Sequence, residues 1–128
     1  MITARRGGGM NICITASGRD LDAAVDQSFG RSGFFLFVDS ETGETKAVEN
    51  SPGAHGAGVQ AAQILVEQGA RVLITGNVGP NAYQGLSAAG IEIYTGASGN
   101  CRKVLADYEA GLLSKTDVPT RAGHGGKR

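Results

Sequence analysis

The residues best suited to chemistry lie in one short stretch near the middle of the chain. Residues 50–60 read Asn-Ser-Pro-Gly-Ala-His-Gly-Ala-Gly-Val-Gln and hold His55, one of the two histidines of the chain. Histidine is the commonest metal-ligating side chain, and glycines such as Gly56 and Gly58 let a backbone approach a ligand closely. A helix is predicted directly afterwards, and its unpaired first N–H groups would suit an anion. We therefore expect a binding site here, with a long surface connection as the plain alternative.

Three further side chains are candidates for this site or for a second one. Arg31 ends the sequence Ser-Phe-Gly-Arg and would offset negative charge on a bound group, while Asn50 opens the central stretch. A solvent-exposed or carboxylate-paired arginine is the alternative for Arg31. Cys101 is predicted near the start of the last helix, where a helix N-terminus would lower the thiol pKa and favour metal binding. Simple core packing is the alternative for Cys101 and the expected role of Cys13.

Several familiar sites are excluded by missing residues. Residues 76–80, Gly-Asn-Val-Gly-Pro, lack the Lys-Ser/Thr pair of a P-loop. Residues 56–61 match the G-x-G-x-x-A pattern of dinucleotide-binding folds, but no acidic residue follows the next strand to hold a ribose. Two cysteines and two scattered histidines are too few for structural zinc or for a self-sufficient iron–sulfur site. No Ser/His/Asp set stands in a nucleophile elbow, so we expect no enzyme.

The elements that position these residues follow the order β-β-β-α-β-α-β-α. Apolar, β-branched runs predict strands in residues 10–16, 33–39, 71–75 and 91–94, and a more polar edge strand is predicted in residues 44–49. Helical spacing of apolar residues predicts helices in residues 57–68, with Gly69 as its end, from Pro80 to Gly90, and in residues 100–110. Residues 20–27 suggest a further turn or two of helix. The alternation predicts an α/β fold with a mixed five-stranded sheet between helices.

The charge is unevenly distributed along the chain, and this limits the kinds of partner that the protein can bind. Residues 10–113 hold six Lys/Arg and eleven Asp/Glu, whereas residues 1–9 add +2 and residues 114–128 add +3. An acidic body matches nucleic-acid phosphates poorly. The chain has no apolar run near the ~20 residues that span a bilayer and no signal-peptide core, and its few cysteines suit a reducing compartment. We expect a cytoplasmic protein that binds neither nucleic acid nor membrane.

The ends of the chain lack apolar periodicity. We expect a disordered leader in residues 1–9, with Met10 as an alternative start, one domain in residues 10–113, and a flexible tail in residues 114–128.

Short motifs, taken in order and spacing, resemble a known family. They are Ser-Phe-Gly-Arg at 28–31 followed by the strand at 34–39, Asn50 with Gly-Ala-Gly at 56–58, Thr-Gly-Asn-Val-Gly-Pro at 75–80, and Gly-Ile-Glu-Ile-Tyr at 90–94. Over residues 10–113 the chain resembles the dinitrogenase iron–molybdenum cofactor biosynthesis family, which includes NifX-like proteins and the C-terminal domain of NifB.

This resemblance implies a fold and a function. The fold would be a three-layer α/β/α ribonuclease H-like arrangement, without nuclease chemistry. The function would be non-catalytic binding or carriage, in nitrogen fixation, of an iron–sulfur-type cluster or an iron–molybdenum cofactor precursor. The cluster would be bound transiently, with metallocluster-assembly proteins as partners, by a monomer or weak homodimer.

In that reading the candidate residues take defined roles. His55 would ligate a metal, and Arg31, Asn50, Gly56 and Gly58 would hold the anionic cluster. Two alternatives remain: a protein-interaction module in metallocluster assembly that binds no metal itself, and a small-molecule enzyme that uses the glycine-rich loops.

Overall fold

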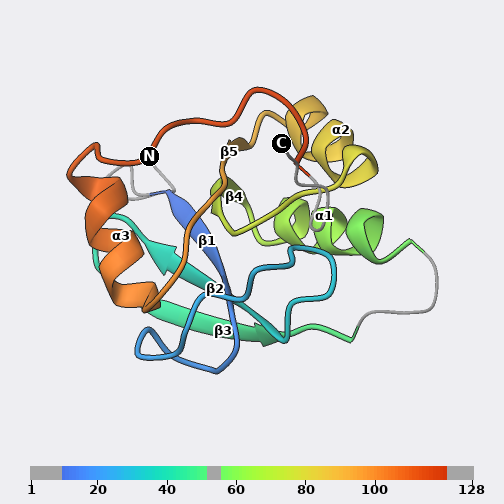
Figure 1. Cartoon of the computed structure of the whole chain (residues 1–128). Helices are drawn as coiled ribbons and strands as arrows, with labels where there is room; N and C mark the ends of the chain where they lie inside the picture. The colour runs from blue at the N-terminus through green and yellow to red at the C-terminus, as the bar shows by residue number, and fades with distance from the viewer. Residues whose placement is uncertain (1–9, 52–55, 121–128) are drawn as a thin grey trace, which may run out of the picture.

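The computed structural model describes residues 10–51 and 56–120, in which strands and helices alternate as predicted (Figure 1). The elements are β1 (Asn11–Ala16), β2 (Phe34–Asp39), β3 (Thr45–Glu49), α1 (Ala57–Glu67), β4 (Ala70–Ile74), α2 (Pro80–Ala88), β5 (Glu92–Tyr94) and α3 (Cys101–Glu109). Pro80 is the first residue of α2, as expected for a residue that lacks an N–H. Among the described residues, no helix is both long and apolar enough to cross a membrane.

The sheet has the strand order β3-β2-β1-β4-β5, with β1 at its centre. β1 pairs antiparallel with β2 and parallel with β4, so Ile14 lies between Leu36 on one side and Ile74 on the other. β3 pairs antiparallel with β2, and β5 pairs parallel with β4. Four strands, β1, β3, β4 and β5, therefore run in one direction, and their carboxyl ends lie at the same edge. The predicted mixed five-stranded sheet is confirmed.

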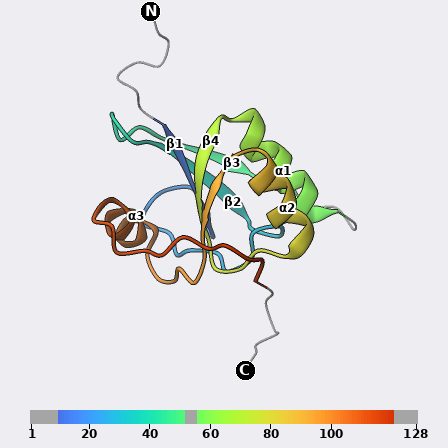
Figure 2. The same ribbon diagram turned by 90° about the horizontal axis from the view of Figure 1, so that it is seen from above.

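Alternate residues along the strands face different helix layers, as the two-residue period of a strand requires. Cys13 of β1 belongs to a buried cluster with Leu65 of α1 and Leu86 of α2. Its neighbour Ile12 belongs to a second buried cluster with Leu105 of α3. Seen from above, α1 and α2 cover one face of the sheet and α3 covers the other (Figure 2). The predicted three-layer α/β/α arrangement is thus confirmed.

Residues 20–27 form no helix, contrary to the sequence expectation. Their backbone pairs with other parts of the chain instead. The amide of Asp26 donates to the carbonyl oxygen of Thr15 in β1 at 2.9 Å, and the amide of Val25 donates to that of Gly99 at 2.7 Å. These tertiary hydrogen bonds need extended backbone and override the local helix propensity, which is weak.

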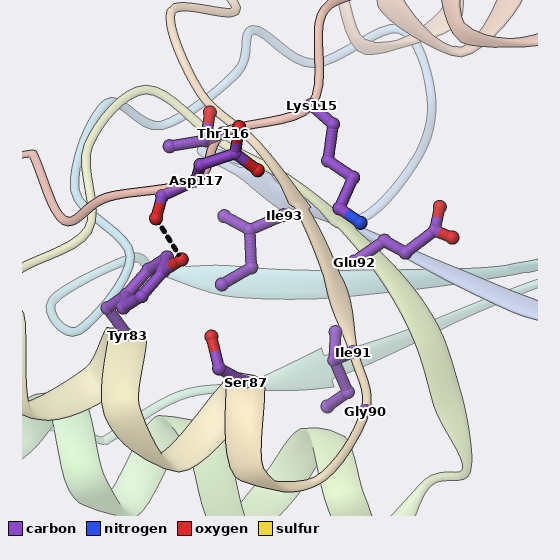
Figure 3. Close-up of a pocket in the computed structure, with 9 residues that line it drawn as sticks. All are labelled: Tyr83, Ser87, Gly90, Ile91, Glu92, Ile93, Lys115, Thr116 and Asp117. Atoms are coloured by element: carbon purple, nitrogen blue, oxygen red, sulfur yellow. Dashed lines mark hydrogen bonds between the residues drawn. The ribbon is translucent and has the colours of Figure 1, made fainter.

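Residues 114–120, which we call the strap, pack against the body, although we expected a flexible tail from residue 114. The amide of Thr116 donates to the carbonyl oxygen of Ile93 in β5 at 2.6 Å. The hydroxyl of Tyr83 in α2 donates to the carbonyl oxygen of Asp117 (Figure 3). Residues 114–120 are therefore not the flexible tail that we expected. Residues 1–9 and 121–128, the rest of the expected leader and tail, lie outside the residues that the structure describes.

Candidate functional site

The loops that carry the candidate residues meet at the carboxyl edge of the sheet. The loop after β1 leads through Arg31 to β2, the connection after β3 leads to Gly56 and α1, and the loop after β4 leads to Gly79 and α2. Because β1, β3 and β4 run in one direction, all three leave the sheet at the edge where open α/β sheets bind ligands. The first and third are joined by a hydrogen bond of 3.2 Å from the amide of Phe29 to the carbonyl oxygen of Asn77.

A cleft of about 300 Å³ lies between the first turns of α1 and α2. It is lined by Gly30 and Arg31, by residues 56–59 and by residues 79–82. No carboxylate is among these residues, and neither helix has an acidic residue in its first turn. Both helix N-termini therefore present their partial positive charge to the cleft without local compensation. We call this cavity the helix-start cleft.

Close backbone packing explains two glycines of the helix-start cleft. A Cβ atom on Gly30 would lie 3.0 Å from the backbone nitrogen of Gly58. A Cβ atom on Gly58 would in turn lie 3.1 Å from the Cβ of Ala82 in α2. The loop before β2, α1 and α2 can therefore approach one another this closely only because neither residue has a side chain.

Both helices that open on the cleft begin after a glycine. Gly56 is the N-cap of α1, with a φ of 69° in the left-handed region that favours glycine. Gly79 is the N-cap of α2 and has extended backbone. A side chain at the N-cap commonly accepts a hydrogen bond from the first helical turn, and glycine has none to do so. Among the described residues, nothing accepts from the N–H groups of residues 57–59 or of Asn81 and Ala82, and Pro80 has none. These first-turn N–H groups are thus left for solvent or a ligand.

Arg31 supplies the cationic side chain of the helix-start cleft. Its backbone amide donates to the hydroxyl oxygen of Ser28 at 3.2 Å, which holds the local turn, and the residue is exposed. Within residues 10–51 and 56–120, the guanidinium takes part in none of the ion pairs. Its positive charge is therefore not neutralised by a carboxylate in that part of the chain, and it can act on a bound anion.

Asn50 has a different role from the ligand contact that the sequence suggested. It is buried, and its side-chain amide nitrogen donates to the carbonyl oxygens of Gly30 at 3.1 Å and Ser32 at 2.9 Å. Its backbone amide donates to the carbonyl oxygen of Gly33 at 3.0 Å. Both side-chain hydrogens are used internally, so Asn50 holds the loop that presents Arg31 and offers no donor to the cleft.

Cys101 lies away from the helix-start cleft, in the layer on the opposite face of the sheet. It is fully buried, and burial, together with the negative charge of Asp20, raises the pKa of its thiol to about 11. This is opposite to the lowering expected from the helix N-terminus, because burial disfavours the charged thiolate. Burial also raises the pKa of the Cys13 thiol. Both cysteines are core residues in the protonated form at neutral pH, and neither is brought to the cleft.

His55 lies outside the described residues, and the next residue in the chain, Gly56, lines the cleft. Across the described part of the chain, no group of three or more His, Cys, Asp or Glu side chains is arranged to hold a metal ion. The charged and hydrogen-bonding groups in the described part of the cleft are backbone N–H donors, the guanidinium of Arg31 and the side chain of Asn81, beside small apolar side chains. The positive charge among them suits an anion better than a bare cation.

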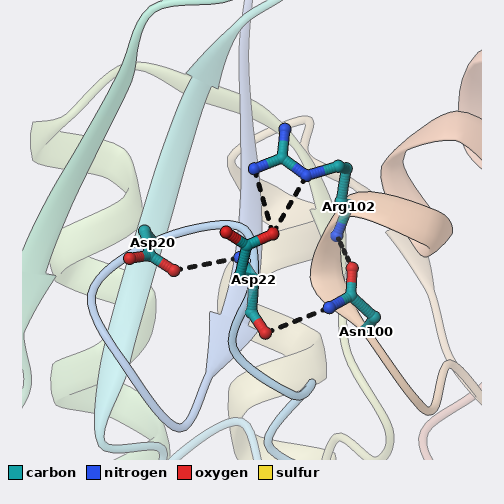
Figure 4. Close-up of polar contacts among 4 residues, drawn as sticks. All are labelled: Asp20, Asp22, Asn100 and Arg102. Carbon is teal, nitrogen blue, oxygen red and sulfur yellow. Dashed lines mark hydrogen bonds and ion pairs between the residues drawn. The ribbon is translucent and has the colours of Figure 1, made fainter.

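A second polar cluster lies at the start of α3 and has a structural role (Figure 4). Asn100 caps α3, since its side-chain oxygen accepts from the amide of Arg102 at 2.9 Å, while its side-chain nitrogen donates to the carbonyl oxygen of Asp22 at 3.0 Å. The guanidinium of Arg102 forms an ion pair with Asp22 at 3.2 Å, and Asp20 accepts from the amide of Asp22 at 3.0 Å. These contacts fasten the loop after β1 to α3.

Sequence reasoning placed the site on one helix start and missed the other. Residues 79–82 of α2 line the cleft as fully as residues 56–59 of α1. The signal for α2 was present, because Gly79-Pro80 predicts a helix start. Consecutive crossovers in a parallel sheet place successive helix starts side by side at one edge, and this rule would have added α2 to the predicted site.

Comparisons with known proteins agree with this architecture. Residues 10–111 match the family model described as dinitrogenase iron-molybdenum cofactor. An uncharacterized protein of Methanocaldococcus jannaschii is 32% identical over 92 residues, which cover 68% of this chain and 78% of that protein.

Two solved structures extend the match. The apo form of the orange protein from Desulfovibrio gigas superposes with a TM-score of 0.85 and 38% identity, covering 88% of this chain and 97% of that chain. A NifB-like protein from Thermotoga superposes with a TM-score of 0.79 and 35% identity, covering 89% and 99%. Since the family model spans nearly the whole described body, the chain belongs to the dinitrogenase iron-molybdenum cofactor family.

Proposed function

We propose that this protein is a cytoplasmic, non-catalytic carrier of an anionic metal–sulfur cluster of the iron–sulfur or iron–molybdenum type, held transiently in the helix-start cleft. The observation that carries the proposal is the sign of the charge around that cleft. Two helix N-termini and Arg31 face it and none of the described residues that line it carries a carboxylate, although residues 10–113 hold eleven acidic and only six basic residues. This contrast with an otherwise acidic body supports a site for a negative group in the cleft.

The chemistry of such a cluster fits the groups that are present. A cluster brings its own sulfides and needs few protein ligands. The first-turn N–H groups of α1 and α2 would donate hydrogen bonds to the sulfides, and Arg31 would offset the net negative charge. Contacts of this kind stabilise a charge without forming many covalent bonds to the protein, so the cluster can leave again.

Family membership supports the same class of cargo. The description of the family names the iron–molybdenum cofactor, and the structure of the related orange protein is that of an apo form, which is a protein without its bound group. We therefore place this carrier among metallocluster-assembly proteins, from which it would receive the cluster and to which it would deliver it.

His55 is proposed as the one metal ligand, because it directly precedes Gly56 in the chain. An imidazole would bind an iron of the cluster in its neutral form, so protonation competes with binding. Cluster retention should then weaken as the pH falls through about 6.5, the ordinary histidine pKa. In the His55→Ala variant, retention should be lower and this pH dependence should disappear. Unchanged retention with an unchanged pH profile would remove His55 from the site.

The main test is cluster retention by charge variants. The protein is incubated anaerobically with iron(II), molybdate and sulfide, desalted, and analysed for bound metal and for visible absorption. Arg31→Gln should lower retention several-fold. Arg71→Gln removes another exposed positive charge, from β4 and outside the cleft. It serves as the matched control and should leave retention unchanged. Equal retention by wild type and both variants, or none by wild type, would count against the proposal.

A second variant tests the helix N-terminus without weakening the fold. The backbone of Gly79 is extended, with φ −76° and ψ 172°, and a Cβ atom there meets nothing within 4 Å. Gly79→Asp should preserve or slightly raise stability, because Asp is a favourable N-cap, yet it places a carboxylate at the cleft and should abolish retention. Gly79→Asn has the same shape without the charge and should retain substantially more cluster. If both variants retained the same amount, charge in the cleft would not govern binding.

The alternative function is a protein-interaction module that binds no metal itself. It is favoured by Val59 and Val66, which lie two turns apart on α1 and are 52% and 51% exposed. Val66→Lys distinguishes the two readings, because Val66 does not line the cleft. The variant should keep its cluster if the protein is a carrier, and it should lose partner binding if this helix face is a docking surface.

A further inference from the structure

The strap begins on β5 and ends on the loop that precedes α2. Near its start, Lys115 pairs antiparallel with Tyr94, and the amide of Thr116 donates to the carbonyl oxygen of Ile93 at 2.6 Å. In its middle, Asp117 accepts the hydrogen bond from the hydroxyl of Tyr83. The strap, α2 and β5 enclose a groove of about 340 Å³ (Figure 3).

At its far end the strap fastens Val78 by two hydrogen bonds. The amide of Thr120 donates to the carbonyl oxygen of Val78 at 2.7 Å. The amide of Val78 donates back to the hydroxyl oxygen of Thr120 at 2.9 Å. Val78 is 1% exposed and immediately precedes Gly79, the N-cap of α2. Both backbone groups of this buried residue are thus satisfied by Thr120 and not by a strand or helix.

We propose that Thr120 is a positioning residue that holds the first turn of α2 in place, and that docking of the strap thereby sets the affinity of the helix-start cleft for its cargo. The cargo part of this proposal rests on the proposed function, and the positioning part does not. Residues 79–82 supply one wall of the cleft, and they start directly after the fastened residue. Release of Thr120 leaves the buried amide of Val78 without its partner and allows that wall to move.

The coupling must be reciprocal. If a docked strap raises the affinity of the cleft for an anionic cluster, then a bound cluster favours the docked strap by the same factor. A partner protein that captured the strap would accordingly lower the affinity of the cleft and release the cluster. This gives a carrier a means to hold its cargo until it meets an acceptor.

The strap itself offers a matched pair of variants. The hydroxyl oxygen of Thr120 accepts from the amide of Val78 at 2.9 Å, and that of Thr116 accepts from the amide of Thr95 at 3.0 Å. Each threonine can be replaced by valine, which has nearly the same shape and lacks the hydroxyl. Thr120→Val and Thr116→Val therefore each remove one acceptor from one backbone amide, and Thr116→Val also removes a contact of 2.7 Å with the hydroxyl of Thr95. Only Thr120 is bound to the residue that precedes the start of α2.

The experiment measures amide hydrogen exchange and cluster retention in both variants. In Thr120→Val, the amide of Val78 and that of Tyr83, the first hydrogen-bonded amide of α2, should exchange about fivefold faster. A fivefold change corresponds to one lost hydrogen bond of about 1 kcal/mol, and retention of the iron, molybdate and sulfide product should fall about as much. In Thr116→Val, only exchange near Thr95 should rise. Thr120→Ser keeps the hydroxyl and should restore wild-type behaviour.

Each outcome decides the proposal. Unchanged exchange at Val78 and the start of α2 in Thr120→Val, or equal effects of Thr120→Val and Thr116→Val on that segment, would overturn it. Faster exchange there with unchanged retention would overturn the link between strap and cleft. If the wild-type protein retains no cluster, the proposed function fails, and exchange alone then decides whether Thr120 positions α2.

Discussion

At the contact between Gly30 and Gly58, one methyl group decides whether the loop before β2 can lie on α1. Gly30→Ala would place its Cβ 3.0 Å from a backbone nitrogen, and a helix backbone cannot yield as a flexible side chain can. We expect a loss of about 1–3 kcal/mol in the free energy of unfolding, as for other overpacked contacts.

A second glycine provides the control for this prediction. The Cβ of Gly85→Ala in α2 would make an ordinary contact of 3.7 Å with Ala62, and alanine favours a helix over glycine by about 0.5–1 kcal/mol. Urea denaturation should therefore show opposite signs for the two variants. A Gly30→Ala protein as stable as wild type would mean that the loop is free to lift from the helix.

The buried thiol of Cys101 predicts a loss of stability at alkaline pH. Its pKa is raised from the ordinary value of 9.0 to about 11, mainly by burial, so the folded state holds the proton more tightly than the unfolded state. The resulting stability is fully present below pH 9 and is lost as the pH rises towards 11. Denaturation of Cys101→Ala should show a shallower decline over this range. A decline identical to that of wild type would contradict the prediction.

Single residues also show what could be read from the sequence at this scale. Arg31, Gly56 and Gly58 line one cleft, and they could be grouped from the sequence because it predicts a loop and a helix start around them. Their part in binding stays a prediction. The role of Asn50 in holding the loop before β2 could not be predicted, since its hydrogen-bond partners Gly30 and Ser32 are distant in the chain. The direction of the Cys101 pKa shift likewise depends on how deeply the thiol is buried, and the spacing of residues in the sequence does not show this.

Among the elements, α3 is the one whose packing can be tested most directly. Leu105 is 9% exposed and belongs to the cluster on its face of the sheet, whereas Leu112 is 71% exposed. Leu105→Ala should lower the free energy of unfolding by about 2–5 kcal/mol, as buried leucine truncations do. Leu112→Ala should change it by only a few tenths, as exposed substitutions usually do. Similar losses in both variants would show that α3 does not dock through Leu105.

Element type and order were predictable because each element carries its own periodicity. Short stretches of sequence are enough to predict the strand that contains Ile12 and Ile14 and the helix that contains Val104 and Leu105. Residues 20–27 were misread because their conformation is set by pairing with β1 and Gly99, which local propensity does not report. The strap was missed for the same reason, since its contacts use backbone groups and hydroxyls without an apolar pattern.

For the whole molecule, the strap is the last segment that the structure describes, and its contribution to stability can be tested by truncation. A chain that stops after Thr120 keeps the hydrogen bonds to Ile93, Tyr83 and Val78, and a chain that stops after Leu113 loses all of them. We expect the longer chain to unfold at the same urea concentration as the full-length protein. The shorter one should be less stable by about 0.5–1.5 kcal/mol for each hydrogen bond lost. Equal stability of the two truncated chains would mean that the body ends before the strap.

Across the whole molecule, the direction of the strands brings the parts of the candidate site together. Three loops that are far apart in the sequence meet because β1, β3 and β4 share an orientation. The sequence predicted the mixed sheet, and with it one functional edge, but not which side chains line the cleft there. That selection depends on approaches such as Gly58 to Ala82, which only the folded chain reveals.

The two ends of the described body lie at opposite edges of the sheet, and this bears on how the protein can be attached to anything else. Met10 exchanges hydrogen bonds with Ser40 at the edge where β1 begins, whereas Thr120 is bound to Val78 beside the start of α2. β1, with 6 residues, separates these edges by roughly 20 Å. Immobilisation through the amino-terminal side would leave the cleft open to solution in a sensor measurement. A tether that continues from Thr120 would emerge next to the cleft and crowd any protein that approaches to exchange cargo.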